Sequence, residues 1–480
     1  MDGGDGVTQE HRPAAAGDER QRVEARGLRR NGLHVELEDD TVGHPVVPGG
    51  VDLARQLADV IEPRHAGEKR EHAFEPTDGR GLRPPAAPSI VTGVDVLVSG
   101  ASIAGPTVAY WLGRAGHRVT VVERSPELRT GGQNIDVRGP GREVLRRMRL
   151  EDAVLAESTG EVGLRFVDED RVLAEFAAGT DDSGGATAQA EILRGTLSRL
   201  LVDGCGGDVN YVFGDQIERL EPGHDAVTAM LASGATLRAD VVIVTEGVRS
   251  RTRDSYFTGV ELRDVGLYTA FGALERTATD DRWWNWYNTT GGRAITLRPD
   301  NVGSTRFTVS FLSGDPRLLG LDATGQRAAL SAAIGDAGWQ APRICAALAD
   351  EGEVYLDYLA QVRMPAWSRG RVVLCGDAWC ATPLSGMGTT LALTGGYVLA
   401  REIERAPALA EAFDSYERLM RPLVDRAQKL PPGVPRLAHP RSRVGVAVTR
   451  KLIGFAGSGP ARRLARRLSM PDTDADQLPA

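Results

Sequence analysis

The chain has 480 residues, 41% hydrophobic and 25% charged, an ordinary globular composition that excludes fibrous and wholly disordered proteins. A formal net charge of −8 offers no electrostatic footprint for nucleic acid, so we expect no nucleic-acid partner. Four cysteines without a C-x-x-C pair favour a reducing, cytoplasmic compartment, and no apolar run approaches a transmembrane segment. The composition therefore indicates a soluble cytoplasmic protein.

Residues 1–90 differ from the rest of the chain. They are dense in charge, glycine and proline, they contain one aromatic residue, Phe74, and only residues 51–61 have the pattern of a short amphipathic helix. Such a segment buries too little apolar surface to offset the entropy of ordering it. We expect residues 1–90 to be disordered, or to be a spurious extension of a native product that starts at Val91.

From residue 94 the pattern is that of an α/β protein. Residues 94–99 form an apolar run typical of a buried parallel strand, residues 105–115 a helix, and residues 118–122 a second strand followed by Glu123. The next predicted elements are a helix at 139–150, a hairpin at 164–176, a helix at 191–202 and several strands within 209–244.

In the second half of the chain the hydrophobic period first shifts towards two, and the pattern of buried strand and helices then returns. Between residues 256 and 362 the period approaches two, so that Phe307, Val309 and Phe311 share one face of a separate antiparallel sheet. A buried strand at 371–375, helices at 389–404 and 408–430, and an arginine-rich tail follow. The predicted fold is α/β, a Rossmann-like domain with an inserted antiparallel β-sheet and C-terminal helices.

The first motif is a glycine turn between the first strand and the first helix. It reads Gly100-Ala101-Ser102-Ile103-Ala104-Gly105, where Gly100 permits the turn and Gly105 close packing of helix on strand. The helix N-terminus then receives a pyrophosphate. Ser102 stands where a glycine is usual, and Glu123 lies at the spacing of an acid that binds the adenosine ribose. These features predict a dinucleotide site.

The second motif follows the strand at 371–375. Gly376 and Asp377 lead through a loop, Pro383-Leu-Ser-Gly-Met-Gly-Thr389, into a helix. An acid at a strand end binds sugar hydroxyls, and a glycine-rich loop lets backbone amides converge on a ligand. Alone, the pattern also fits a strand-to-helix corner with a capping aspartate. Beside the first motif, the ligand-binding interpretation is favoured.

Three blocks in this order carry a family resemblance. They are V-D-V-L-V-S-G-A-S-I-A-G-P with the following E-R, D-V-V-I-V-T-E-G-V-R-S-R-T-R, and G-R-V-V-L-C-G-D-A with P-L-S-G-M-G. Over residues 91–430 the chain resembles the class A flavin-dependent monooxygenases, such as p-hydroxybenzoate hydroxylase, and more closely the tetracycline-inactivating and polyketide-hydroxylating members. The resemblance implies FAD as cofactor, NADPH or NADH and O2 as co-substrates, and oxygen insertion into an aromatic or polyketide-like molecule through a flavin C4a-hydroperoxide. Hydroxylation, epoxidation and Baeyer–Villiger insertion all remain open.

The resemblance also implies which residues bind FAD. Residues of the first motif and its ribose acid would hold the ADP half, Asp136 and Arg194 would lie along the cofactor, and the second motif would meet the pyrophosphate, the ribityl chain and the ring. The full set of expected cofactor contacts is Gly100, Ser102, Ile103, Ala104, Gly105, Glu123, Arg124, Asp136, Arg194, Gly376, Asp377, Gly386, Met387, Gly388 and Thr389.

The implied domains follow the blocks. Residues 91–255 would form the first part of the FAD-binding domain, with inserted strands. Residues 256–365 would form the substrate-binding sheet and 366–405 the last part of the FAD-binding domain. Residues 406–480 would contribute C-terminal helices and a basic tail. No residue is assigned to a metal.

Five further residues are candidates for nicotinamide or substrate contacts. Arg129 precedes a glycine-rich loop, and Glu246, where the family usually has aspartate, is followed by Arg253. Trp284 and Trp286 belong to the densest aromatic cluster, and strand alternation would put both on one face, either to stack a planar substrate or to pack in a core.

Two alternatives to a monooxygenase are a flavin-dependent halogenase and a non-catalytic flavin-fold binding protein. A flavin-dependent halogenase would have a W-x-W-x-I-P motif, which Trp284-Asn-Trp-Tyr287 does not continue into. A non-catalytic flavin-fold binding protein is compatible with Ser102 and Glu246. The basic C-terminus, with Arg450, Lys451 and four arginines between 462 and 467, is either a solvated helix face or a basic amphipathic helix for an anionic surface.

Overall fold

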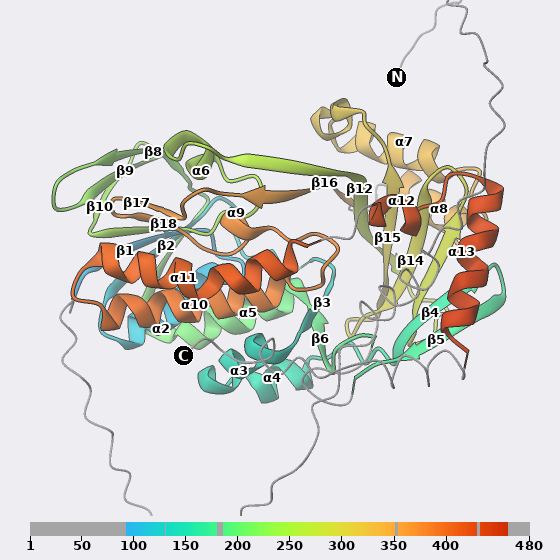
Figure 1. Cartoon of the computed structure of the whole chain (residues 1–480), viewed down its shortest axis with the longest axis horizontal. Helices are drawn as coiled ribbons and strands as arrows, with labels where there is room; N and C mark the ends of the chain where they lie inside the picture. The colour runs from blue at the N-terminus through green and yellow to red at the C-terminus, as the bar shows by residue number, and fades with distance from the viewer. Residues whose placement is uncertain (1–92, 130, 180–185, 351–353, 430–432, 459–480) are drawn as a thin grey trace, which may run out of the picture. The chain divides into compact units, whose positions relative to one another are not determined.

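The computed structural model describes residues 93–129, 131–179, 186–350, 354–429 and 433–458. The expectations for residues 1–90, including the helix at 51–61 and the start at Val91, lie outside these ranges. The described elements combine a mainly parallel sheet, a separate antiparallel sheet and C-terminal helices, which confirms the predicted fold class (Figure 1).

A six-stranded sheet of order β17-β18-β11-β1-β2-β7 carries the first motif. Five of its strands are parallel and β17 pairs antiparallel to β18. Val96, Leu97 and Val98 are at most 2% exposed, as expected for a central strand buried on both faces. The strands are β1 (Asp95–Ser99), β2 (Arg118–Glu123), β7 (Val209–Phe213), β11 (Val241–Val244), β17 (Ser368–Arg369) and β18 (Val372–Leu374), which confirms the strands predicted at 94–99, 118–122 and 371–375.

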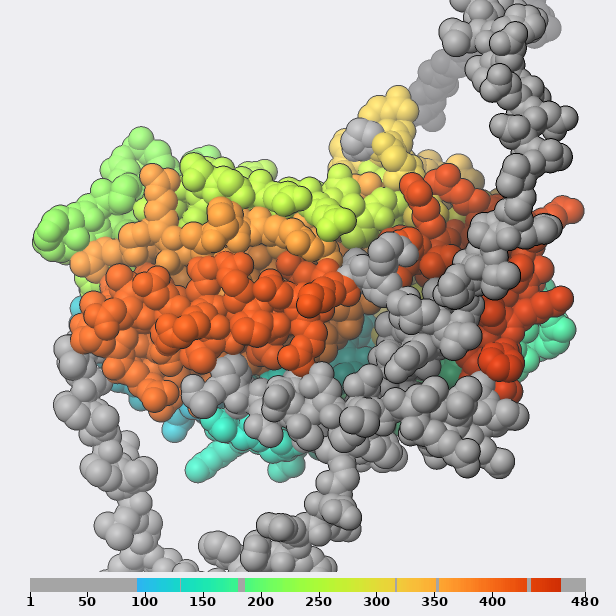
Figure 2. Space-filling view, viewed as in Figure 1, coloured from blue at the N-terminus to red at the C-terminus, as the bar shows by residue number. Residues whose placement is uncertain are grey.

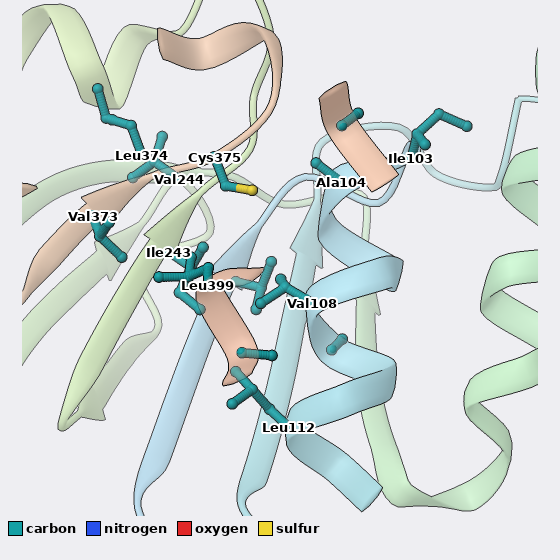
Figure 3. Packing of buried hydrophobic residues seen from close by; sticks show 14 of the residues in the cluster. Ile103, Ala104, Val108, Leu112, Ile243, Val244, Val373, Leu374, Cys375 and Leu399 are labelled. Atoms are coloured by element: carbon teal, nitrogen blue, oxygen red, sulfur yellow. The ribbon is translucent and has the colours of Figure 1, made fainter. Parts of the chain in front are cut away.

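Helices pack on this sheet through apolar side chains. Helix α2 lies against α5 and α10, and α10 also contacts α3 and α11. Figure 3 shows Val108 and Leu112 of α2 beside Ile243 of β11 and Leu399 of α10, all buried. The helices are α2 (Ala104–Arg114), α3 (Gly139–Met148), α4 (Glu151–Ala156), α5 (Arg194–Cys205), α10 (Gly388–Arg405) and α11 (Leu409–Ala427).

The helix predicted at 191–202 was wrong at its start. Residues Ala190–Leu193 form strand β6, which pairs antiparallel with β3 (Asn134–Val137), and the helix begins at Arg194. All four β6 residues are buried. The segment forms a strand because pairing with β3 and the packing of its side chains outweigh its weak helical tendency. Arg194 is therefore the first residue of α5.

A small antiparallel sheet completes this part of the chain. It has the order β10-β9-β8, and β10 lies against β1. Its strands, β8 (Ile217–Pro222), β9 (Val227–Leu231) and β10 (Thr236–Ala239), confirm the run of strands predicted within 209–244, and α6 (Arg251–Tyr256) follows β11.

The second large sheet has seven strands in the order β16-β12-β15-β14-β13-β4-β5. All neighbours are antiparallel except β13 and β4, which run parallel. The hairpin predicted at 164–176 therefore lies in this sheet, far in sequence from its partners. The strands are β4 (Gly163–Asp168), β5 (Arg171–Ala177), β12 (Glu261–Glu275), β13 (Trp284–Thr289), β14 (Arg293–Pro299), β15 (Ser304–Leu312) and β16 (Val354–Arg363).

One face of the seven-stranded sheet is covered by two helices. Phe307, Val309 and Phe311 share this face, as predicted, and pack with Ile334 of α7 (Ala323–Ile334) and Ile344 of α8 (Ala341–Ala349). Neither helix was predicted, because their alanine-rich segments lie inside the region where the period of two dominates. The opposite face of the sheet is not covered by these two helices.

Three short or C-terminal helices remain. They are α9 (Asp377–Cys380), α12 (Val434–Ala438) and α13 (Arg443–Ala456), and α13 packs against β5 and β13. Among the described residues, no helix is both long and apolar enough to cross a membrane. The four cysteines are all free thiols.

Candidate functional site

The glycine turn after β1 has the geometry that the first motif requires. Gly100 adopts a φ of +109°, and its amide donates to the Val122 carbonyl over 2.8 Å. A Cβ on Gly100 would lie 2.8 Å from the Thr245 carbonyl oxygen, and one on Gly105 would lie 1.9 Å from the Gly100 carbonyl oxygen. Both positions therefore exclude any side chain, and the turn stays tight against the start of α2.

The second motif touches the first. Gly376 has a φ of +65°, and a Cβ there would lie 2.8 Å from the Ala104 Cβ. The turn after β18 thus abuts the first residue of α2, although the two motifs are far apart in sequence. The structure brings both glycine motifs to one edge of the parallel sheet, where ligands bind in open α/β folds.

Two helix N-termini at this edge lack a side-chain cap. Neither α2 nor α10 has an N-cap side-chain hydrogen bond or an acidic residue in its first turn. Met387, Gly388 and Thr389 at the start of α10 are half-buried, and Gly386 before them is exposed with a φ of +69°. Uncapped amides with a positive dipole end favour anionic groups such as a pyrophosphate. The residues present therefore fit a dinucleotide cofactor.

Glu123, the last residue of β2, is hydrogen-bonded to the glycine turn. Its carboxylate accepts hydrogen bonds from the Ala101 amide over 2.8 Å and from the Ser125 amide over 3.0 Å. Ile103 and Ala104 of the turn are buried, whereas the neighbouring Arg124 is exposed. Glu123 is thus fixed beside the turn, at the place where the sequence motif expects a ribose acid.

Arg194 and Ser102 meet across the site. The Arg194 guanidinium donates to the Ser102 hydroxyl over 2.9 Å, and Ser198, one helical turn later, donates to the carbonyl oxygens of Ala101 and Ser102. The serine that departs from the glycine pattern is therefore an acceptor for the arginine that opens α5. Asp136 on β3 lies in an ion pair with Arg138 at 3.2 Å.

Asp377 is the first residue of α9, and it is exposed to solvent. Desolvation raises the pKa of its carboxyl, while the positive charge of Arg194 acts to lower it and the negative charge of Asp357 to raise it. Asp377 and Arg194 thus lie within electrostatic range of each other. A carboxylate in this place can accept a hydrogen bond from a cofactor hydroxyl.

The carboxylate of Glu246 is hydrogen-bonded to neighbouring residues of the chain. Its carboxylate accepts from the hydroxyls of Ser99 (2.6 Å), Ser250 (2.8 Å) and Thr252 (2.5 Å) and from the Thr252 amide (3.1 Å). The extra methylene relative to aspartate is thereby accommodated in a network that joins the end of β1 to the start of α6. The geometry gives Glu246 a structural role beside the site.

Arg253 lies beneath the second motif. Its side chain is fully buried and its guanidinium donates to the Ala378 carbonyl over 3.1 Å and to Asp254 over 2.8 Å. Because Ala378 follows Asp377, Arg253 supports the turn from inside. Arg129 is exposed and donates to the Ser125 hydroxyl over 2.9 Å.

Trp284 and Trp286 share one face of the seven-stranded sheet, as alternation predicted. Their ring centroids are 5.5 Å apart, and Trp286 lies 6.0 Å from Phe166. Trp286 pairs in register with Thr296 on β14, which pairs with Thr308 on β15. This row continues through Phe271 on β12 to Tyr355 on β16. The row lies on the face opposite α7 and α8.

An ion-pair cluster holds the Trp284 end of this face. The Arg298 guanidinium lies 4.3 Å from the Trp284 ring centroid and donates to Glu161 over 2.7 and 3.1 Å. Glu191 of β6 is also 3.1 Å from Arg298, and burial raises the pKa of both carboxyls. Since Glu191 precedes Arg194 by three residues, the cluster ties the aromatic face to the cofactor edge.

Sequence reasoning missed three residues between the two regions. Arg249 donates to Asp357 over 2.8 Å, and desolvation of Tyr355 raises the pKa of its hydroxyl while Arg194, Arg249 and Arg129 act to lower it. Tyr355 therefore lies within electrostatic range of Arg194, Arg249 and Arg129. Arg249 belongs to the same block as Glu246 and Arg253, which is a usable signal; the positions of Tyr355 and Asp357 depend on strand pairing.

Comparison with known proteins agrees with this geometry. The family model of the FAD binding domain matches residues 93–429. The flavin-dependent monooxygenase eupH of Phoma sp is 35% identical over 421 residues, covering 81% of this chain and 97% of its own. The FAD-dependent monooxygenase asL4 of Sarocladium schorii is 30% identical over 419 residues, covering 78% and 97% respectively.

Solved structures have the same architecture. The tetracycline destructase Tet(51) aligns with a TM-score of 0.66 and 27% identity, covering 80% of this chain and all 100% of its own. Klebsiella pneumoniae HpxO, solved with FAD and uric acid, aligns with a TM-score of 0.61 at 23% identity, covering 78% of this chain and 95% of its own, and supports the fold alone.

Proposed function

The chain belongs to the FAD-binding-domain family of flavin-dependent monooxygenases, and from that premise we propose that it uses NADH or NADPH and O2 to insert one oxygen atom into an oxygen-rich aromatic or polyketide-like small molecule. The cytoplasmic location expected from the four free thiols belongs to the same proposal.

The observation that carries the substrate class is a set of unpaired donors on the aromatic face. The indole Nε1 atoms of Trp284 and Trp286 and the hydroxyl of Thr296 are buried and have no hydrogen-bond partner among the residues that the structure describes. A buried donor without a partner costs free energy, about 1–3 kcal/mol each. Carbonyl or phenol oxygens of a substrate would satisfy these donors on displacing the side chains that cover them, and the half-buried indole rings would supply a stacking surface.

The face is connected to the cofactor side through Tyr355. The row from Trp286 to Tyr355 runs along one face of the sheet, and its Tyr355 end lies within the field of Arg194. Arg194 in turn holds Ser102 of the glycine turn. A substrate on this row would therefore lie against the edge where the two glycine motifs meet.

Residues of the chain would bind and orient the cofactor. We assign the ADP half of FAD to the glycine turn, with Glu123 as ribose acceptor, and the pyrophosphate to the uncapped N-terminus of α2 and to Arg194. Asp377 would meet the ribityl chain, and the uncapped N-terminus of α10 would stabilise negative charge on the ring. Bound FAD would supply the redox chemistry, taking electrons from the nicotinamide and activating O2. We assign the nicotinamide phosphates to the exposed guanidinium groups of Arg129 and Arg249.

Reconstitution of the purified protein tests this proposal. The protein should be yellow or bind added FAD, and polyphenolic polyketides should accelerate its consumption of NADH or NADPH and yield a product heavier by one oxygen atom. Protein that cannot be reconstituted with FAD would contradict the cofactor assignment. Tight binding of polyphenols with no acceleration would instead support the non-catalytic binding protein.

A further inference from the structure

The outer face of helix α13 is an apolar stripe with no cover among the described residues. Val444, Val448 and Phe455 are 73%, 50% and 59% exposed. With Lys451 they are spaced as one line along a helix of 3.6 residues per turn. Leu437 of α12 adds a fourth exposed apolar side chain, at 47%. Figure 2 shows α13, in red, at the surface of the molecule.

The inner face of the same helix is already used. Val446 and Ile453 are buried, and Ile453 packs with Ala174 and Phe176 of β5. Arg450 lies in an ion pair with Asp168 at 2.5 Å and donates to the Asn288 carbonyl over 3.0 Å. These contacts fix α13 on the sheet with its second apolar stripe turned outward.

The charged residues of α12, α13 and the segment between them are all basic. Arg436, Arg441, Arg443 and Lys451 are exposed, and none of them forms an ion pair with another described residue. From Arg426 to Pro471 the sequence has eleven basic residues and no aspartate or glutamate, in a chain whose net charge is −8. The basic character is thus concentrated in the segment that contains the apolar stripe.

We propose that α13 is an interfacial helix that docks the enzyme on an anionic lipid surface. A single line of apolar side chains flanked by cations matches the boundary between acyl chains and negatively charged headgroups. A second copy of the chain fits less well, because a two-fold contact would bring Arg443 and Lys451 against the same cations. Three large side chains also fall short of the area of a stable protein interface.

Vesicle sedimentation of the full-length, FAD-loaded protein tests the proposal. The protein should bind phosphatidylcholine vesicles that contain phosphatidylserine, bind pure phosphatidylcholine at least about tenfold more weakly, and be released by high salt. Phe455→Ser should weaken binding roughly tenfold, and Lys451→Glu at least about fivefold, since each surface cation contributes that much. Val302→Ser, which alters an equally exposed apolar side chain (61%) in the turn between β14 and β15, is the matched control and should bind like wild type.

The results of the vesicle experiment can be distinguished from the results that test the proposed function. All variants should keep FAD absorbance and melting temperature, because the outer face of α13 contacts neither the core nor the cofactor edge. The proposal is overturned if the protein ignores phosphatidylserine vesicles or if Phe455→Ser and Lys451→Glu bind like wild type. It is equally overturned by light scattering that finds a dimer which Phe455→Ser dissociates. None of these results bears on FAD binding or turnover.

Discussion

Gly105→Ala tests the glycine turn directly. The new Cβ would lie 1.9 Å from the Gly100 carbonyl oxygen, whereas a carbon–oxygen contact needs about 3.3 Å. Helix α2 and the turn must therefore separate by roughly 1.4 Å. Overpacking of this kind costs about 1–3 kcal/mol of unfolding free energy, and a displacement of about 1 Å at a binding site weakens function on the order of 100-fold. We expect the dissociation constant for FAD to rise by about that factor.

The assay is a titration of the flavin-free protein with FAD, followed by flavin fluorescence, with a thermal melt in parallel. Gly207→Ala is the control, because a Cβ there meets no atom within 4 Å in the described part of the chain and the residue has no left-handed φ. The control should bind FAD like wild type. If Gly105→Ala melts cooperatively and binds FAD within about twofold of wild type, the turn is not the cofactor site and the reasoning fails.

Three further predictions concern the supporting groups. Burial raises the pKa of the Glu191 carboxyl, so the folded state retains a proton and loses stability as pH rises above the ordinary value of 4.5; Glu191→Gln should flatten this fall in a profile of melting temperature against pH, and a profile parallel to wild type would refute it. Arg253→Met should lower the unfolding free energy by about 2–3 kcal/mol in urea denaturation, since the buried donor to Ala378 is lost, and an unchanged midpoint would count against that support. Trp286→Leu should raise KM for a polyphenolic substrate about tenfold with unchanged FAD affinity, whereas an unchanged KM would remove Trp286 from the substrate face.

Local signals in the sequence were sufficient to recognise the two glycine turns that meet at one edge of the parallel sheet. The turn from Gly100 to Gly105 and the turn at Gly376 each depend on backbone conformations that only glycine adopts readily, so their residues are recognisable without knowledge of the fold. The alternation that placed Trp284 and Trp286 on one face is also local, since side chains of a strand alternate whatever its neighbours.

The remainder depends on pairing between distant segments. Glu191 lies in a strand only because β3 pairs with it, and the hairpin β4–β5 joins the seven-stranded sheet through β13, more than a hundred residues later. The row that leads from Trp286 to Tyr355 crosses five strands, so its composition follows from register, which one-residue shifts would change completely. Sequence patterns alone do not determine such registers.

The most direct test of the central claim is the origin of the oxygen atom in the product. The FAD-loaded protein is supplied with NADPH or NADH, a polyphenolic polyketide and heavy-isotope-labelled O2, and the product is analysed by mass spectrometry. A monooxygenase should place one labelled atom in each product molecule. Product that contains oxygen from water alone, or oxidation of the nicotinamide with no labelled product from any polyphenol that accelerates it, would contradict the account.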